Sequence, residues 1–340
     1  MKKILSRILT LAVLFTLAAA TSSCVHEWPE PLPTRGVSFT VHHELKWDQK
    51  EFNSGIGMQT REDVNDLAVR YIYRVYPKGN TTNPVIETTE YRTDLTLADF
   101  TTELQVPVGK YDVYVWTDFV KKDSDTGLYY DAKNFKAIRY TTPYKGDTMD
   151  KDAFAGMIEV DIPSSIDAVI DINYNITVKR PLTGFAFISS DLEEFTKGEI
   201  ARRKLNRDGA EGGLPAFDFT GYKVKLSYTG YLPCEYDMFR AKPVDSATGV
   251  SFEGEIRVLN DNEAVVGFDL FFINGLQSTI RVALDIYDPD GERIAGFPSL
   301  DVPVWLSTIT LVKGNFLTTK ASGGVGIDPG FDGEFNIKWN

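Results

Sequence analysis

The sequence predicts a mainly β protein with two tandem antiparallel β-sandwich domains behind an export signal. Apolar and polar residues alternate with a period of two along many short runs, which is typical of strands with one buried face. Turns rich in Pro, Gly, Asn and Asp separate these runs, and only one segment after the signal has a helical pattern. Many short strands joined by turns favour sandwiches over parallel βαβ units.

The beginning of the chain has the pattern of a bacterial export signal. Three basic residues precede an uncharged run, residues 8–20, which is too short to span a bilayer comfortably. Small residues at 21–23 then lead to Cys24. This arrangement resembles a lipobox, whose cysteine carries acyl chains and becomes the first residue of the mature protein. We therefore expect a lipid-anchored protein of the outer membrane, exposed at the cell surface.

Two alternatives to this interpretation stay open. Lipoboxes usually have Leu where Thr21 stands, so residues 1–23 are either a lipoprotein signal peptide or an ordinary one. If Cys24 is lipidated, residues 24–34 form a tether and Cys234 is left without a partner. If Cys24 is not lipidated, a Cys24–Cys234 disulfide is the competing prediction.

The charge of the chain excludes two classes of partner. The net charge is −12, and removal of the basic signal would make it more negative. Such a chain lacks the cluster of Lys and Arg that neutralises phosphates, so nucleic acid is excluded as a partner. It would also be repelled by anionic lipid, so membrane attachment must come from acyl chains.

The first sandwich is predicted over residues 35–179. Tight connections at 77–80 and 107–110 punctuate its strands. The strand-like runs are 37–41, 67–75, 104–106, 111–117, 138–140, 156–162 and 168–178.

The second sandwich is predicted over residues 180–340, because Pro181 interrupts the alternation and removes a backbone donor. It opens with one short helix over 190–205, where Ser190 and Glu193 form a capping box, although Gly198 weakens the helical pattern. Its strand-like runs are 222–228, 250–259, 264–273, 280–287, 308–318 and 335–339.

Three segments in this order resemble the fimbrillin-like family, the type V pilus subunits and anchors of Gram-negative anaerobes. Residues 101–116 have a strand, a Pro-x-Gly turn and a Tyr-x-x-x-x-Trp strand. Residues 176–185 are similar to the junction between the family's two domains, and residues 312–320 to the entry into its last strands. The resemblance covers the whole mature chain and implies two transthyretin-like, Ig-like domains. It also implies a fimbrial anchor, an accessory protein or a structural and adhesion subunit.

The resemblance further implies that subunits assemble by β-strand addition. The candidate segment for strand exchange is 334–339, where Phe335, Ile337 and Trp339 share one side. The alternative is that this segment closes its own domain. Proteolytic maturation in the family follows an Arg, for which Arg35 and Arg61 are candidates here; both could equally be surface residues.

No enzyme signature is present, so we predict a protein that is not an enzyme and needs no cofactor or metal. The sequence lacks the Gly-x-Ser-x-Gly, His-Glu-x-x-His and Cys-x-x-Cys motifs. His42 and His43 are expected on opposite faces of a strand, which makes them poor joint metal ligands. Residues 123–127 and 288–292 contain Asp and Gly but lack the bidentate Glu of a calcium loop.

Glycan capture at the cell surface is the alternative function. Aromatic residues make up 12% of the chain, and exposed rings on a sandwich can bind sugars. We expect Tyr114 and Trp116 to pack in the core, because both lie on an alternating strand. Tyr129 and Tyr130, in a predicted loop, are the candidate glycan contacts.

Overall fold

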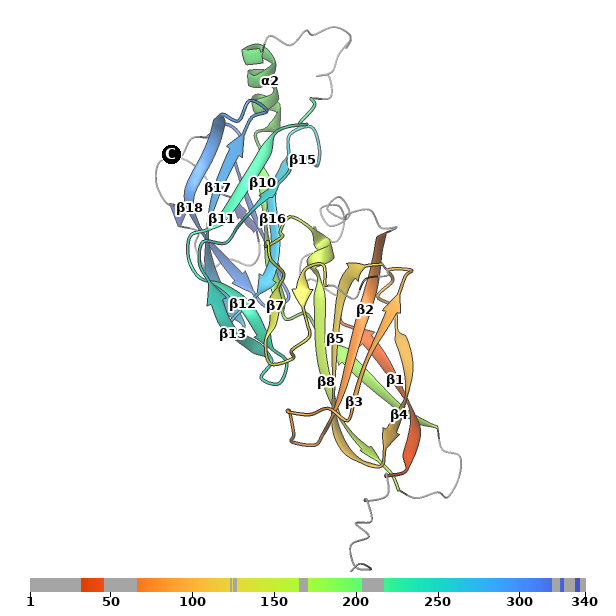
Figure 1. The fold of residues 1–340 in the computed structure, drawn as a ribbon. Helices are drawn as coiled ribbons and strands as arrows, with labels where there is room; N and C mark the ends of the chain where they lie inside the picture. The colour runs from red at the N-terminus through yellow and green to blue at the C-terminus, as the bar shows by residue number, and fades with distance from the viewer. Residues whose placement is uncertain are drawn as a thin grey trace, which may run out of the picture.

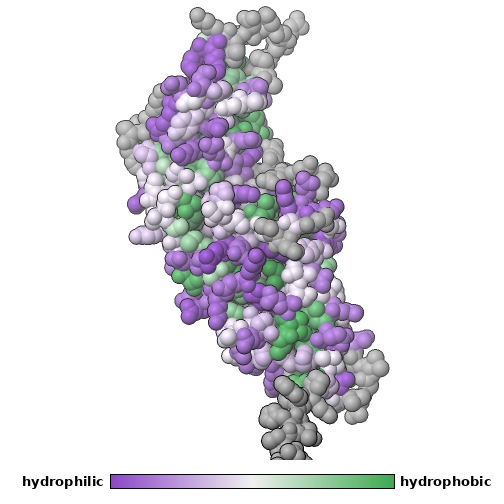
Figure 2. Space-filling view, viewed as in Figure 1, coloured by the Kyte–Doolittle hydropathy of each residue, from purple (hydrophilic) through white to green (hydrophobic). Residues whose placement is uncertain are grey.

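The prediction of a mainly β fold with tandem sandwiches is confirmed. The computed structural model describes residues 32–45, 66–122, 124, 127–164, 171–203, 217–319, 325–326 and 334–336. Strands dominate both halves of the chain, and most neighbouring strands run antiparallel (Figure 1). No helix in the described part of the chain is long and apolar enough to cross a bilayer. Hydrophilic and hydrophobic residues are mixed over the face of the molecule that Figure 2 shows.

The N-terminal sandwich packs a three-stranded sheet on a four-stranded one. β1 is central in the first sheet, antiparallel to β4 and parallel to β9. Its inward residues Val37, Phe39 and Val41 meet buried residues of the second sheet, such as Val113 and Val115. The first sheet has the order β4 (Phe100–Pro107), β1 (Thr34–His43), β9 (Ile172–Val178). The second has the order β3 (Ile86–Arg92), β2 (Leu67–Pro77), β5 (Gly109–Lys121), β8 (Ala153–Ile162).

The C-terminal sandwich consists of two five-stranded sheets. The first sheet has the order β15 (Arg257–Val258), β16 (Ala264–Phe272), β10 (Leu182–Ser189), β19 (Ile309–Gly314), β21 (Glu334–Asn336). The second has the order β14 (Ser251–Gly254), β11 (Lys223–Tyr228), β17 (Gln277–Tyr287), β18 (Arg293–Trp305), β20 (Val325–Gly326). Helix α2 (Leu192–Arg203) lies at one end and buries Leu192 and Phe195, as its pattern predicts.

A third sheet joins the two halves of the chain. The stretch 127–152 leaves β5, runs over the C-terminal half and returns to β8; we call it the crossing segment. It contains β6 (Tyr130–Asp131), β7 (Ile138–Tyr140) and the 3-10 helix η3 (Met149–Lys151). β6 and β7 complete a sheet with β12 (Leu232–Asp237) and β13 (Lys242–Ala247), in the order β13-β12-β7-β6.

A hydrophobic core lies beneath the crossing segment and includes residues from both sandwiches. The ring of Trp116 on β5 lies 5.4 Å from that of Tyr130 and 6.3 Å from that of Tyr236. Tyr236 in turn stacks on Phe272 of β16 at 5.3 Å. The division of the chain at 179/180 stays a prediction, because the crossing segment belongs to one half in sequence and packs on the other.

Candidate functional site

The structure describes only some of the residues that the sequence singles out. Cys24, Arg61, Ile337 and Trp339 lie outside the described residues. Phe335 is described as the middle residue of β21.

β21 forms one edge of the first sheet of the C-terminal sandwich. It runs parallel to β19, and its described residues pair in the register Leu311↔Glu334, Val312↔Phe335 and Lys313↔Asn336. The opposite side of β19 pairs with β10, also in parallel. β21 therefore covers the main-chain donors and acceptors along one side of β19, the place where an added strand would bind.

A clamp at the start of α2 fixes the chain where it leaves β19. The backbone N–H groups of Phe316 and Leu317 donate to Ser189 Oγ at 2.9 and 3.1 Å. The backbone N–H and Oγ1 of Thr318 donate to Asp191 Oδ2 at 2.8 and 2.6 Å. The Ser189 hydroxyl itself donates to Asp191 Oδ1. Residues 316–318 are thus held by two buried side chains before the chain continues toward β21.

The placement of Tyr129 and Tyr130 corrects the sequence-based expectation of exposed rings. Tyr130 begins β6, is fully buried and donates its hydroxyl to the Lys151 carbonyl at 2.6 Å. Tyr129 is 2% exposed. Tyr114 and Trp116 are buried, as predicted. The crossing segment packs against the shared core, which closes off the Tyr130 ring, while Tyr129 lines the cavity described next.

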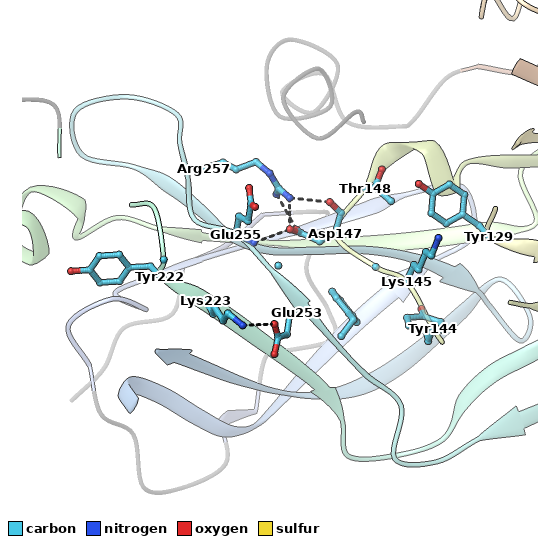
Figure 3. A pocket seen from close by; sticks show the side chains of 14 residues that line it. Tyr129, Tyr144, Lys145, Asp147, Thr148, Tyr222, Lys223, Glu253, Glu255 and Arg257 are labelled. Carbon is cyan, nitrogen blue, oxygen red and sulfur yellow. Dashed lines mark hydrogen bonds and ion pairs between the residues drawn. The ribbon is translucent and has the colours of Figure 1, made fainter. Parts of the chain in front are cut away.

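One side of the crossing segment borders a cavity of about 610 Å³ (Figure 3). Residues 144–148 form one wall, and residues of β11, β14 and the turn before β15 form the other. Asp147, in the first wall, has a φ of 62°. Arg257 donates to Asp147 Oδ1 and to its carbonyl, both at 2.9 Å, and the backbone N–H of Glu255 donates to Asp147 Oδ2 at 3.0 Å.

The charges around this cavity largely neutralise one another. Burial raises the pKa of Asp147, while Arg257 opposes that rise. The side chains of Lys223 and Glu253 are both exposed and form an ion pair at 3.2 Å. Within the described ranges, no group of three His, Cys, Asp or Glu could hold a metal ion. The cavity therefore lies at the contact between the crossing segment and the C-terminal sandwich, and its lining has no excess of positive or negative charge that would select a charged ligand.

Sequence analysis missed a buried polar cluster between the crossing segment and β16. Lys151 Nζ lies 2.8 Å from Asp269 Oδ1, and the two side chains are 1% and 0% exposed. The hydroxyls of Tyr144 and Tyr228 donate to Asp269 Oδ2 at 2.5 and 2.6 Å. The sequence does contain one indication of this cluster: Asp269 is the single charged residue within the apolar run 264–273, and a charge in a buried strand needs a partner.

The two histidines and the one cysteine within the described residues, His42, His43 and Cys234, contact other parts of the fold. His42 Nδ1 lies 2.7 Å from Asp99, while His43 points inward against Tyr71 and Phe154, so the two do lie on opposite faces. Cys234 is half-buried on β12 and forms no disulfide within the part of the chain that the structure describes. Burial raises the pKa of its thiol, which disfavours the reactive thiolate.

Comparison with known proteins assigns a family. Residues 33–340 match the model of a family of unknown function, DUF6562. The chain belongs to the DUF6562 family. No curated protein matches this DUF6562 chain in sequence.

Solved structures similar to the DUF6562 chain include adhesins and fimbrial proteins. A candidate adhesin from Bacteroides ovatus ATCC 8483 is 12% identical, with 90% of this chain and 93% of that chain covered and a TM-score of 0.41. The fimbrial anchor protein Mfa2 from Porphyromonas gingivalis is 14% identical, with coverages of 78% and 82% and a TM-score of 0.36. The tip fimbrial protein Mfa3 from the same organism is 9% identical, with coverages of 78% and 81% and a TM-score of 0.35. At these TM-scores the likenesses carry no functional argument.

Proposed function

We propose that the protein is a non-enzymatic outer-membrane lipoprotein that serves as a fimbrial anchor, accessory protein or structural subunit. Acyl chains on Cys24 would hold it at the cell surface, and strand addition would join it to neighbouring subunits. The observation that supports assembly most directly is the pairing of β21 with β19.

This pairing is suited to exchange because it lies at an edge of the sheet and is made by main-chain contacts. The described residues of β21 pair with Leu311, Val312 and Lys313 of β19, and β21 is the last of the described strands in that sheet. A strand from a second subunit in the same register would restore every main-chain hydrogen bond that β21 makes, so exchange has little enthalpic cost. The clamp of Ser189 and Asp191 would keep residues 316–318 in place while the segment beyond them changes partner.

Engineered cysteines distinguish pairing within one chain from pairing between chains. The register places Lys313 opposite Asn336. In a Cys234→Ser background, cells should express one chain with Lys313→Cys and a second, differently tagged chain with Asn336→Cys. We expect a disulfide-linked species that contains both tags. The matched control replaces Lys313→Cys with Glu193→Cys, an exposed position on α2, and should not cross-link.

A chain that carries both Lys313→Cys and Asn336→Cys reports the competing arrangement. If the disulfide forms only within that chain, and never between the two tagged chains on intact cells, β21 closes its own sheet and strand addition at β19 is wrong. Deletion of the gene should in that case leave surface filaments unchanged.

The lipid anchor has a separate test. Cells fed a clickable fatty acid should label the wild-type protein, and Cys24→Ala should remove the label and release the protein from membranes. Cys234→Ser is the matched control and should keep the label. An unlabelled wild-type protein with a Cys24–Cys234 disulfide would instead support the ordinary signal peptide.

A further inference from the structure

The pair Lys151 and Asp269 joins two segments that are far apart in sequence. Lys151 ends η3 in the crossing segment, and Asp269 lies in the middle of β16 of the C-terminal sandwich. Nζ and Oδ1 are 2.8 Å apart, and both side chains are buried. Two other buried ion pairs among the described residues, Arg70–Asp118 and Arg180–Asp152, use a guanidinium in place of an ammonium group.

The surroundings of this pair are aromatic rings, two tyrosine hydroxyls and a backbone N–H group. Nζ lies 4.6 Å from the ring centre of Tyr140 and 3.8 Å from that of Tyr144. The Tyr144 hydroxyl is 2.5 Å from Nζ and 2.5 Å from Asp269 Oδ2. The Tyr228 hydroxyl donates to the same Oδ2, and the backbone N–H of Leu270 donates to Oδ1 at 2.8 Å.

Such an environment favours the neutral form of the amine. Taking a charged amine out of water has a large desolvation cost, which loss of its proton removes. Burial accordingly lowers the pKa of Lys151 to about 8, although Asp269 opposes that change. The neutral amine is a nucleophile, and the carboxyl carbon lies one bond beyond the oxygen that it contacts.

We propose that Lys151 and Asp269 condense to form an isopeptide bond between the crossing segment and the C-terminal sandwich. The arrangement holds the two reacting groups together, excludes water and directs hydrogen-bond donors at the carboxyl group. This proposal does not depend on the lipid anchor or on strand addition.

The step balances without any further reactant. Nζ attacks Cγ of Asp269, and the developing negative charge on Oδ2 is stabilised by the hydroxyls of Tyr144 and Tyr228. The C–Oδ1 bond then breaks. Two of the three ammonium protons leave with Oδ1 as water, and the third stays on the amide nitrogen. Tyr144 contacts both Nζ and Oδ2, so its hydroxyl can pass a proton between them.

Peptide mass spectrometry of the whole purified protein tests the bond directly. After denaturation and trypsin digestion, residues 146–179 should be joined to residues 258–281 in a branched peptide, lighter than the sum of the two by one water molecule. We expect most molecules to carry it. Recovery of unlinked peptides, with cleavage after Lys151, would overturn the proposal.

Two variants test whether Lys151 is the linked residue. Lys151→Arg keeps the buried cation but cannot form the amide, so the branched peptide should vanish. If the branched peptide persists, another residue is linked and the proposal is wrong. The matched control Lys145→Arg changes an exposed lysine of the same segment and should leave the bond intact. If Lys151→Arg does not fold, the tryptic digest of the wild-type protein still shows whether the bond is present.

Tyr144→Phe tests the assigned proton relay and keeps the ring. Removing one donor to the developing oxyanion should slow bond formation by about 100-fold. The measurement is the linked fraction against time after refolding. Unchanged kinetics would show that Tyr144 takes no part in the reaction.

Discussion

Arg180 and Asp152 form a bidentate ion pair at the passage between the two sandwiches. Arg180 Nε and Nη2 each donate to the carboxylate at 2.8 Å, and the side chains are 5% and 6% exposed. Arg180 follows β9, and Asp152 immediately precedes β8. Arg180 also donates to the Glu44 carbonyl at 3.2 Å and lies over the Phe154 ring at 4.6 Å. One guanidinium thereby links the ends of three strands.

Replacing Arg180→Met should destabilise the protein strongly, because Asp152 would stay buried without its partner. We expect a loss of about 3–5 kcal/mol in the free energy of unfolding, measured by urea denaturation of the whole chain. The double variant Arg180→Met/Asp152→Leu should recover most of that loss, since it leaves no buried charge. Lys78→Met breaks the exposed Lys78–Glu159 pair and should leave the urea midpoint nearly unchanged.

His43 should make stability depend on pH below neutrality. Burial lowers its pKa to about 4, and Arg180 adds to that effect while the Leu97 carbonyl and Asp99 oppose it. The unfolded chain binds this proton near pH 6.5, so stability falls as pH decreases from 6.5 to about 4 and then levels off for this group. The loss is about 3 kcal/mol.

The variant His43→Phe checks this assignment. Phe should fit the aromatic contacts with Tyr71 and Phe154 and remove the fall in urea midpoint between pH 7 and pH 4. His42→Gln, at the neighbouring half-exposed position, should retain it. An equally steep fall in His43→Phe would assign the pH dependence to another group.

The alternation of apolar and polar residues predicted strands that have one buried and one polar face. It did not predict strands in which apolar and polar residues do not alternate. β3 reads Ile-Glu-Thr-Thr-Glu-Tyr-Arg, a mostly polar edge strand, and was missed. β18 was missed because it contains Pro298 and Pro303. Pro298 lies where the register with β17 shifts, between Val282 and Leu284, so the missing donor interrupts no regular pair.

Sequence analysis could not predict which strands of different halves would meet. Residues 138–140 were predicted as a strand, yet nothing in them shows that β7 pairs with β12. The same limit hid the contact between Lys151 and Asp269, because it arises from the path of the crossing segment over the shared core. Tyr129 and Tyr130 were expected to be exposed for the same reason. They lie in a predicted loop, which the crossing segment buries against the shared core.

Asp191→Ala should loosen the chain where it leaves β19. Asp191 Oδ2 accepts from the backbone and the hydroxyl of Thr318, and its loss leaves both donors without that acceptor. We expect the amides of residues 316–318 to exchange hydrogen at least about tenfold faster, the equivalent of about 1.4 kcal/mol. Glu193→Ala, which removes only an exposed pair with Lys197, should leave those amides unchanged. Unaltered exchange in Asp191→Ala would show that Ser189 alone holds the segment.

Gly184→Ala and Gly198→Ala should have opposite effects, because their surroundings differ. A Cβ at Gly184 on β10 would lie 2.7 Å from the Asp269 carbonyl oxygen, which is backbone and cannot move aside cheaply. We expect a destabilisation of about 1–3 kcal/mol and, because β16 must shift, a lower linked fraction for Lys151 and Asp269. A Cβ at Gly198 meets nothing within 4 Å, so Gly198→Ala should stabilise α2 by about 0.5–1 kcal/mol. Urea midpoints of both variants check the signs, and an unchanged midpoint for Gly184→Ala would mean that the two strands can separate without cost.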